Sequence, residues 1–298
     1  MQRTAFALVT LLALAAPASA AEDFVGIRPL GMGNAGRAYA TGDAGLALNP
    51  SGMALVKEYH AEGSYGFSTL RTDHFIHASI TDSTSEYHLA GGVYYTFHAS
   101  HPDGGISGSG HEVGLALALP AGQYVAVGGT LKFLHLSGDQ APNGQDGGLT
   151  FDVGLTIHPM PLFSLGVVGT NLRNLSTSLA QQGIAYGGAI FPIPTVMLAA
   201  DGVTPFAADT YTGRKATSVR AGADALLADH YEPRIGGGFD GASGNGYLTV
   251  GMSLVDDIGA VDVGLRQDLT RGAGFPRETV VGLALRLFVP ANQPAPEQ

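Results

Sequence analysis

The first residues in the chain that could do chemistry form a glycine-rich run. Gly31-Met32-Gly33-Asn34-Ala35-Gly36 matches the G-x-G-x-x-G pattern that holds the pyrophosphate of a dinucleotide. That chemistry needs a buried strand directly before the glycines and a βαβ unit around them, so that a helix N-terminus meets the phosphates. No such pattern surrounds this run. We therefore expect no nucleotide site.

Histidines are the second candidate set, and six of the ten lie between residues 74 and 111: His74, His77, His88, His98, His101 and His111. A metal centre needs three or four ligands that converge. His74 and His77 are three apart in an extended segment and point to opposite faces, and no third ligand is specified for His98 and His101. We expect solvated loop or lumen histidines and no metal.

The sequence contains no pattern that indicates nucleophilic catalysis. Ser, His and Asp residues occur, but nothing resembles a nucleophile elbow or an ordered triad. The sequence holds no Cys, which excludes a thiolate nucleophile, a thiolate zinc site, a disulfide framework and lipid attachment at an exported N-terminus. We expect neither an enzyme nor a cofactor.

The composition points away from an ordinary soluble enzyme. Only 13% of the 298 residues are charged, against about a quarter in a typical soluble domain, while 45% are hydrophobic and 44 are Gly. Outside the first 20 residues, no apolar run reaches the ~18 residues of a membrane-spanning helix. The formal net charge of -10 offers no basic patch for phosphates, so nucleic acid is not an expected partner.

The N-terminus predicts export. Arg3 gives a positive start, Ala5–Ala16 form an apolar stretch, and Ala18-Ser19-Ala20 has the small-x-small pattern of a cleavage site. We predict a signal peptide over residues 1–20 and a mature start at Ala21. At the other end, residues 289–298 are rich in Pro and Gln and predict a disordered periplasmic tail.

Between residues 58 and 288 the sequence alternates with the period of a β-strand. Val113, Leu115 and Leu117, for example, alternate with Gly114 and Ala116. Fourteen segments show this pattern, near 58–67, 73–81, 86–98, 110–120, 122–136, 148–158, 161–170, 183–191, 194–204, 215–226, 231–240, 246–255, 258–268 and 278–288.

The connections between these segments sort into two kinds. Every second connection is tight, at Asp82–Ser85, Pro120–Gln123, His158–Pro161, Pro192–Pro194, Ala228–Tyr231 and Asp256–Ile258. The others are mostly longer and rich in turn residues. Short turns on one side and long loops on the other are typical of an outer-membrane β-barrel. The predicted fold is an all-β, membrane-spanning antiparallel barrel over residues 58–288, with both termini in the periplasm because the strand number is even.

The two faces of the segments support this interpretation. One face carries large apolar residues that suit contact with membrane lipid. The other carries Gly, Ala, Ser and Thr with scattered charges, which would cost ~2–4 kcal/mol each near the bilayer midplane if they faced lipid. We therefore predict that these charges face the lumen: Glu62, Glu112, Lys132, Asp152, Arg220, Asp224, Glu232, Arg234, Asp262, Arg266 and Arg286.

The residues before the first strand, 21–57, lack this alternation and are rich in Gly and Ala. We expect short helical turns near Asn34–Ala40 and Ala44–Leu48, the second with Asp43 as its N-cap and with Pro50 ending it.

The same stretch resembles a known hatch. The run Pro29–Ala40 (PLGMGNAGRAYA), then Asp43, then Asn49–Ala54 (NPSGMA) is similar to the N-terminal hatch of FadL-type fatty-acid transporters and equally to the start of PorV-like outer-membrane proteins. Ser51 stands where those families have Ala. The hatch residues carried over are Gly31, Gly33, Gly36, Asp43, Asn49, Pro50 and Gly52. Gly166–Leu172 also resembles a strand-end pattern of the PorV-like group.

The resemblance implies a hatch inside or beneath the barrel, serving as a gate or ligand platform, or else only as a stabilising plug. It implies passive uptake of hydrophobic small molecules, such as a fatty acid, across an outer membrane. The alternative is a PorV-like barrel that acts as a scaffold or shuttle for envelope protein partners in a secretion or surface-motility complex. The chain length, 298 residues, is nearer to the PorV-like members.

Overall fold

The structure is a computed structural model that describes residues 25–69, 73–85, 89–100, 108–138, 147–175, 180–208, 213–270 and 277–288. The predicted signal peptide over residues 1–20, the first four residues of the predicted hatch, the predicted tail over residues 289–298, and His88 and His101 lie outside the described residues.

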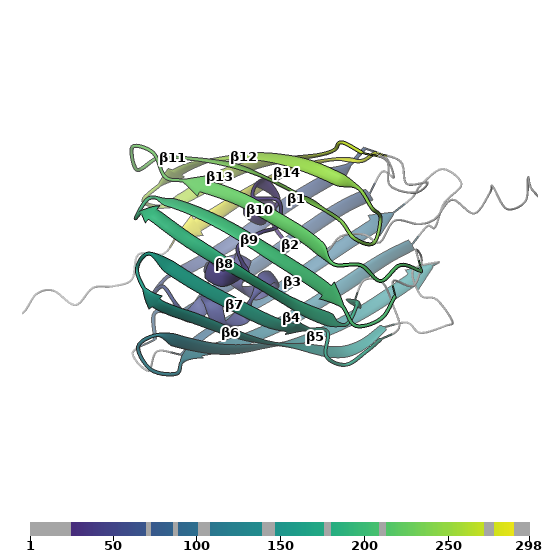
Figure 1. Ribbon diagram of the computed structural model, residues 1–298, viewed down its shortest axis with the longest axis horizontal. Helices are drawn as coiled ribbons and strands as arrows, with labels where there is room; N and C mark the ends of the chain where they lie inside the picture. Colours follow the sequence, from purple (N-terminus) through teal and green to yellow (C-terminus); the bar gives the residue numbers. More distant parts are fainter. Residues whose placement is uncertain are drawn as a thin grey trace, which may run out of the picture.

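Fourteen antiparallel strands close into a barrel in which every strand pairs with its sequence neighbour and β1 pairs with β14 (Figure 1). The prediction of a fourteen-stranded antiparallel barrel is confirmed. The strands are β1 (Tyr59–Ser68), β2 (Asp73–Asp82), β3 (Ala90–Ser100), β4 (Gly108–Pro120), β5 (Val125–Gly138), β6 (Gly147–Met160), β7 (Phe163–Thr170), β8 (Gly183–Ile193), β9 (Val196–Pro205), β10 (Ser218–Ala225), β11 (Tyr231–Phe239), β12 (Gly246–Asp256), β13 (Gly259–Asp268) and β14 (Thr279–Phe288).

Alternation of side-chain size explains why these segments form a closed sheet. In β4, Leu115 and Leu117 are half exposed on the outer face, whereas Ala116 and Ala118 are buried on the inner face. The same alternation recurs around the ring and leaves a belt of exposed large apolar residues outside. Closure pairs the backbone groups of all fourteen strands, so the described part of the sheet has no open edge.

Tight turns gather at one end of the barrel, at the left in Figure 1. They join β4 to β5, β6 to β7, β8 to β9 and β12 to β13, and the first residue of β1 and the last of β14 lie at the same end. The connection after β2 is longer than predicted, because β3 begins only at Ala90. Ser83 continues along the chain before β1, where its hydroxyl donates to the Val56 carbonyl and accepts from the Glu58 N–H.

The residues before β1 form short helical elements inside the ring, drawn in purple in Figure 1. They are α2 (Ile27–Gly31), η1 (Arg37–Tyr39), α3 (Gly42–Leu48) and η2 (Pro50–Ala54). We call residues 25–57 the N-terminal segment. The predicted turn at Asn34–Ala40 is reduced to η1, and α2 and η2 were not predicted. Within the described residues, no helix has the length and apolar character that a membrane crossing requires.

Asp43 is not the N-cap of α3, contrary to the prediction. The N-cap is Thr41, which makes no side-chain capping bond, and Asp43 lies in the first turn of the helix. Its carboxylate bonds to His77 of β2 instead. The helix ends at Leu48, before Pro50, as the sequence indicates.

Candidate functional site in the barrel lumen

The N-terminal segment follows the inner wall through much of its circumference. Helix α2 contacts β11–β14, η1 contacts β6–β8, α3 contacts β1–β4 and η2 contacts β3–β6. Most of its residues are buried, including Ile27, Leu46 and Met53. The segment therefore decides how much of the lumen is open.

Glycines on both sides allow the close approach of segment and wall. A β-carbon on Gly31 would lie 3.0 Å from Cα of Gly251, and one on Gly33, whose φ is +69°, would lie 2.6 Å from the Gly237 nitrogen. A β-carbon on Gly128 of β5 would lie 2.6 Å from the Ser51 nitrogen. Gly31 and Gly33 of the G-x-G-x-x-G run thus serve packing against strands, and within the described residues, which begin at Val25, no strand precedes the run.

The other two predicted hatch glycines, Gly36 and Gly52, shape the segment itself. Gly36 has a φ of +123°, which favours glycine, and precedes η1. Gly52 lies against the backbone of Ala40, where a β-carbon would collide with the carbonyl group. These positions fold the segment back on itself, so that η2 lies beside α3.

Asn49 and Pro50 set the turn into η2. The fully buried Asn49 amide donates to the carbonyl of Arg37 at 2.8 Å and to Oγ1 of Thr156 at 3.0 Å. Its Oδ1 accepts from the Ser51 N–H and hydroxyl, at 3.2 and 2.7 Å. One side chain thereby joins η1, η2 and strand β6. Pro50 occupies the first position of η2, where its missing N–H costs nothing.

Asp201 of β9 anchors the middle of the segment. Its Oδ2 accepts from the backbone N–H groups of Gly36 and Arg37, at 2.9 and 3.1 Å, and from Arg37 Nη1 at 3.2 Å. The prediction missed both Asp201 and Arg37. The alternation in β9 could have revealed Asp201, because this residue lies on the same inward face as Met197 and Ala199. The same reasoning predicted the other lumen charges.

Asp43 joins α3 to the wall. Its Oδ1 lies 3.0 Å from His77 Nε2, and its backbone N–H donates to His60 Nε2 at 2.9 Å. Burial alone would raise the pKa of the Asp43 carboxyl, but the facing His77 imidazole and its neighbours lower that pKa below the usual value. His77 also bonds to Thr96 of β3 at 2.8 Å.

A network of charges covers the inner faces of β10–β14 near the tight-turn end. Arg234 is fully buried and contacts Asp224 at 3.0 Å, Asp262 at 3.2 Å, and Glu232. Arg286 bonds to Asp262 at 2.8 Å. Arg28, from α2, completes the network.

Arg28 reaches Asp224 at 3.4 Å and Glu232 at 3.2 Å. Three guanidinium groups thus meet three carboxylates, and this balance of charge suits a buried network.

The other predicted lumen charges also occupy inward positions, toward the long-loop end or beside α3. Lys132 pairs with Asp152 at 2.9 Å. Arg266 pairs with Asp268 at 3.2 Å and stacks over Tyr247. Glu112 accepts from the Tyr94 hydroxyl. Glu62 of β1 is buried, and Arg220 lies on the inner face of β10.

Among the described histidines, His60 and His77 both contact Asp43, and the rings of His111 and His135 stack with their centroids 6.3 Å apart. His74 and His111 lie on the outer face, where the hydroxyls of Tyr65 and Tyr95 bond to their Nδ1 atoms at 2.7 and 2.8 Å. His77 points into the lumen. Among the described residues, no three His, Asp or Glu side chains are arranged as a metal centre.

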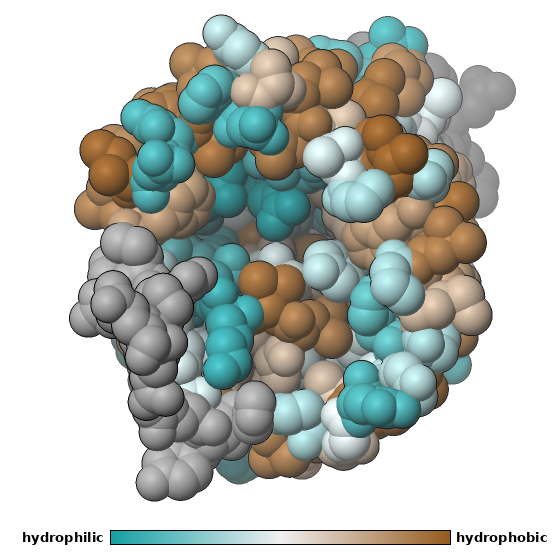
Figure 2. Space-filling model, turned by 90° about the vertical axis from the view of Figure 1, so that its left-hand side faces the viewer, coloured by the Kyte–Doolittle hydropathy of each residue, from teal (hydrophilic) through white to brown (hydrophobic). Residues whose placement is uncertain are grey.

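Figure 2, looking at the tight-turn end, shows a hollow with hydrophilic residues deep in its wall and a hydrophobic patch across its middle. Apolar residues of the segment pack on the wall in separate clusters. Met32, Ala35 and Ala38 pack with Met197 and Ala199, beside the rings of Tyr39 and Phe191, whose centroids are 4.8 Å apart. Leu46 and Met53 pack with Tyr94 and inward alanines. The lumen therefore offers both polar and apolar surface.

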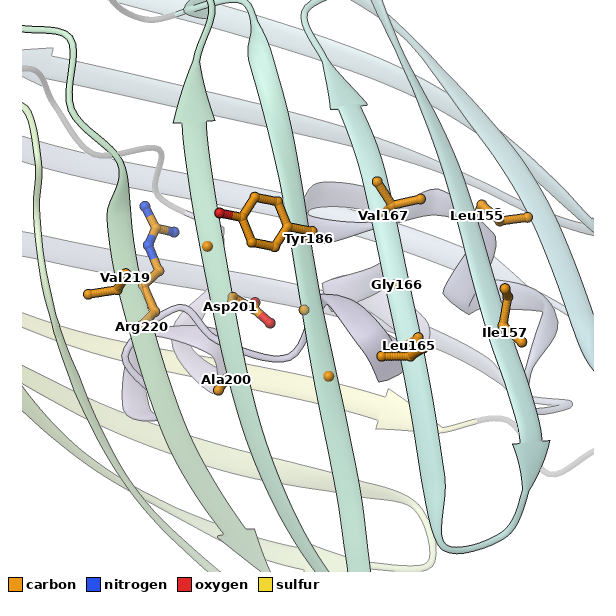
Figure 3. Close-up of a pocket in the computed structure, with 13 residues that line it drawn as sticks. Leu155, Ile157, Leu165, Gly166, Val167, Tyr186, Ala200, Asp201, Val219 and Arg220 are labelled. Atoms are coloured by element: carbon orange, nitrogen blue, oxygen red, sulfur yellow. The ribbon is translucent and has the colours of Figure 1, made fainter.

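A groove lies on the other side of the wall, over β6–β10 (Figure 3). Its volume is about 670 Å³, and its outward lining includes Leu165, Val167, Tyr186 and Val219. Gly188, Ala200 and Gly202 form its floor because they carry little or no side chain. The groove is apolar, and Asp201, which anchors the segment, lies in its wall.

The barrel is similar to three solved hydrocarbon transport proteins. The CymD monoaromatic hydrocarbon channel aligns with a TM-score of 0.65 and 15% identity, over 90% of this chain and 98% of that one. The Ralstonia pickettii toluene transporter TbuX gives 0.64 and 13%, and the Pseudomonas putida toluene transporter TodX gives 0.60 and 10%, with the same coverage. This chain has their fold. No family model and no curated protein sequence matches it.

Proposed function

We propose that the protein is an outer-membrane channel for the passive passage of small hydrophobic molecules, and that the N-terminal segment is its hatch. The fold is that of outer-membrane transporters. In the printed descriptions, three structural neighbours carry monoaromatic hydrocarbons or toluene. Diffusion down a gradient needs no catalytic residue and no cofactor.

The position of the segment carries this proposal. It lies inside the ring along the inner wall, and the Asp201 anchor is beside the apolar cluster of Met32, Ala35, Ala38, Met197 and Ala199. A small hydrophobic molecule in the lumen would compete for this apolar contact. A segment that shifted around Asp201 would expose the surface such a molecule needs, whereas an unoccupied wide barrel would pass polar solutes as well.

The outer groove adds an apolar surface on the membrane side of the same strands. β8 and β9 hold the segment on one face and form part of the groove on the other. A hydrophobic molecule in the membrane and one held beside the segment would therefore lie on opposite faces of the same strands.

The experiment that tests this function uses purified protein in liposomes. We compare the full chain with Asp201→Asn, with a deletion of residues 31–47, and with Asp257→Asn, an exposed control in a tight turn. Toluene, a long-chain fatty acid and a small polar dye serve as probes. We expect the full chain to admit a hydrophobic probe and exclude the dye, and the first two variants to lose this discrimination.

The result that contradicts the channel is a barrel that inserts but stays closed to every probe in all forms. Co-purification of such a closed barrel with envelope proteins would favour the PorV-like scaffold or shuttle. Discrimination unchanged by Asp201→Asn and by the deletion would mean that the segment is a stabilising plug.

We further propose that residues 1–20 are removed on export, that residues 289–298 form a periplasmic tail, and that the tight turns face the periplasm. Cysteine at Gly122, in the tight turn after β4, should then resist an impermeant thiol reagent on intact cells. Cysteine at Gly144, in the long connection after β5, should react. Equal labelling would contradict this orientation.

A further inference from the structure

Four polar residues lie side by side on the outer face of the barrel, where β4 begins and β5 ends. Strand register pairs Ser109 with Ser137 and His111 with His135, so the four positions form a rectangle of roughly 5 by 7 Å. We call these four residues the Ser109–His135 patch. All four are half-buried or exposed, whereas the intervening Leu134 faces inward and is buried.

Hydrogen bonds and ring contacts hold the side chains of the patch in place. The hydroxyls of Ser109 and Ser137 bond to each other at 2.7 Å. The Tyr95 hydroxyl of β3 bonds to His111 Nδ1 at 2.8 Å, and the His111 and His135 rings stack with their centroids 6.3 Å apart. Within the part of the chain that the structure describes, His111 Nε2 and both ring nitrogens of His135 bond to no protein group. These nitrogens are therefore available to a molecule outside the barrel.

The patch lies at the edge of the apolar band that faces the membrane. On β4 the outward residues between the tight turn and His111 are Leu119, Leu117, Leu115 and Val113, each 47–52% exposed. His111 is eight positions from Leu119, which at about 3.4 Å per residue and a strand tilt of about 40° is roughly 20 Å along the barrel axis. The apolar band of such barrels is about 25 Å tall. The patch is therefore close to the level of the lipid head groups.

The composition of the outer face differs around the ring at this level. Near the long-loop end, β10, β11 and β12 carry the exposed apolar residues Val219, Phe239 and Leu248. On β4 and β5 the corresponding positions carry hydroxyl and imidazole groups, and no outward position of these two strands carries Asp or Glu. Hydrogen-bond donors that gather without a neighbouring carboxylate suit an anion, because a charged acceptor forms the stronger hydrogen bonds.

We propose that the Ser109–His135 patch binds a phosphate group on the head group of a phosphorylated glycolipid in the outer leaflet. The phosphate oxygens accept from His111 Nε2–H, from an N–H of His135 and from a serine hydroxyl. With the Tyr95 hydroxyl donating to Nδ1, a neutral His111 ring carries its proton on Nε2, as this contact requires. The acyl chains of the lipid lie along the apolar band below the patch.

This lipid site goes beyond the proposed channel function, because it concerns what holds the barrel in its leaflet and not what passes through it. It rests on the proposed orientation, in which the long connections face away from the periplasm. The thiol-labelling experiment at Gly122 and Gly144 decides that orientation separately.

The test measures lipid binding by the purified full chain in detergent. The probes are diphosphorylated lipid A, dephosphorylated lipid A and inorganic phosphate. Native mass spectrometry counts the bound lipids, and titration with a fluorescent lipid A, with the three probes as competitors, gives the affinities. We expect the phosphorylated lipid to bind more tightly than either other probe, because its phosphate and its acyl chains contribute together.

A double variant removes the imidazole donors and keeps an aromatic ring at each position. His111→Phe combined with His135→Phe should weaken binding of phosphorylated lipid A at least about tenfold, a typical effect of losing a hydrogen bond to a charged group. Binding of the dephosphorylated lipid should stay unchanged. His230→Phe, the same change at an exposed histidine of a tight turn, is the matched control and should bind as the unaltered chain does. Heat-modifiable migration on gels confirms that each variant is folded.

Three results would overturn the site. The unaltered chain binds the two forms of lipid A equally, or the double variant binds phosphorylated lipid A as tightly as the unaltered chain, or His230→Phe weakens binding as much as the double variant does. In any of these cases the patch is only a polar part of the belt at the membrane surface. Because transport is not the readout, failure of the lipid site leaves the channel proposal to be decided by its own experiment.

Discussion

Two arcs of the inner wall hold the two ends of the N-terminal segment by different means. On β10–β14, helix α2 is fixed by Arg28, whose guanidinium enters a network built around Arg234. On β4–β8, η1 and η2 contact the wall through uncharged groups, and the ion pair of Arg37 in η1 is made with Asp201 of the next strand, β9. Asn49 and Ser51 bond to Thr156, and Ser164 Oγ donates to the Ala38 carbonyl at 2.5 Å.

The first arc therefore holds the segment mainly by charge, and the second holds it mainly by close packing. The charged arc depends on a few groups whose loss leaves others buried and unpaired. The uncharged arc depends on many close contacts over glycines, such as Gly128 and Gly166, where the chain can approach the wall. We expect the first arc to be sensitive to the removal of a charge and the second to the addition of volume.

The largest effect is expected from Arg234→Met in the charged arc. The side chain of Arg234 is fully buried, and its loss leaves Asp224, Glu232 and Asp262 short of positive charge. We expect the free energy of unfolding to fall by about 3–5 kcal/mol, measured by urea unfolding in lipid vesicles. The exposed Arg277→Met serves as control. A change as small as that of the control would mean that water already screens the network.

The next effect is expected from Gly166→Ala in the uncharged arc. A β-carbon there would collide with the carbonyl oxygen of Arg37, so the segment must move away from β7. Overpacking of this kind costs about 1–3 kcal/mol, again measured by unfolding. Gly63→Ala is the matched control, since a β-carbon at that position meets nothing within 4 Å. Equal stability of the two variants would show that the segment does not press on β7.

A smaller effect is expected from Thr156→Val, which removes a hydroxyl while keeping the side-chain shape. Asn49 and Ser51 each lose one bond to Thr156. The net cost of a typical hydrogen bond, about 1 kcal/mol, sets the expected loss of stability. Thr195→Val, in an exposed tight turn, is the control. A loss as large as that of Arg234→Met would erase the distinction between the two arcs.

The smallest effect on stability is expected from Ala200→Phe, on the outer face of the wall that carries Asp201. The new ring fills the groove over β6–β10 without touching the lumen, and surface changes of this kind stay within about 0.5 kcal/mol. Liposome uptake of toluene should nevertheless fall if molecules rest in the groove. Unchanged uptake would restrict the hydrophobic route to the lumen.

The barrel could be predicted from the sequence because the same alternation of residue types repeats in every strand. Large apolar residues alternate with Gly, Ala and Thr over fourteen segments, and each segment overlaps an observed strand. The inward positions of the eleven predicted charges follow from the same alternation. The predicted start of β3 was too early, because the chain after β2 first bonds through Ser83 to Val56 and Glu58, and nothing in the local pattern shows that contact.

The N-terminal segment was harder to predict because tertiary contacts form it. Helices of three to seven residues are too short to be stable by themselves, so local propensity says little about where they begin. Asp43 matched an N-cap pattern, but its carboxylate bonds to His77 of a wall strand. The inward position of Asp201 could be predicted from the strand alternation. Its pairing with Arg37 could not, because the two residues are 164 positions apart in the chain.

The pairing of β1 with β14 has a topological consequence. The ring closes only when the last strand meets the first, and the segment is joined to β1 at the tight-turn end, so that end is its way into a closed ring. Because the segment stays attached to β1 at that end, it can leave the lumen only there. A circular permutant with new termini at Gly122 would keep every strand pair but would close the ring at β4 and β5. Assembly of the wall and enclosure of the segment would then become separate events.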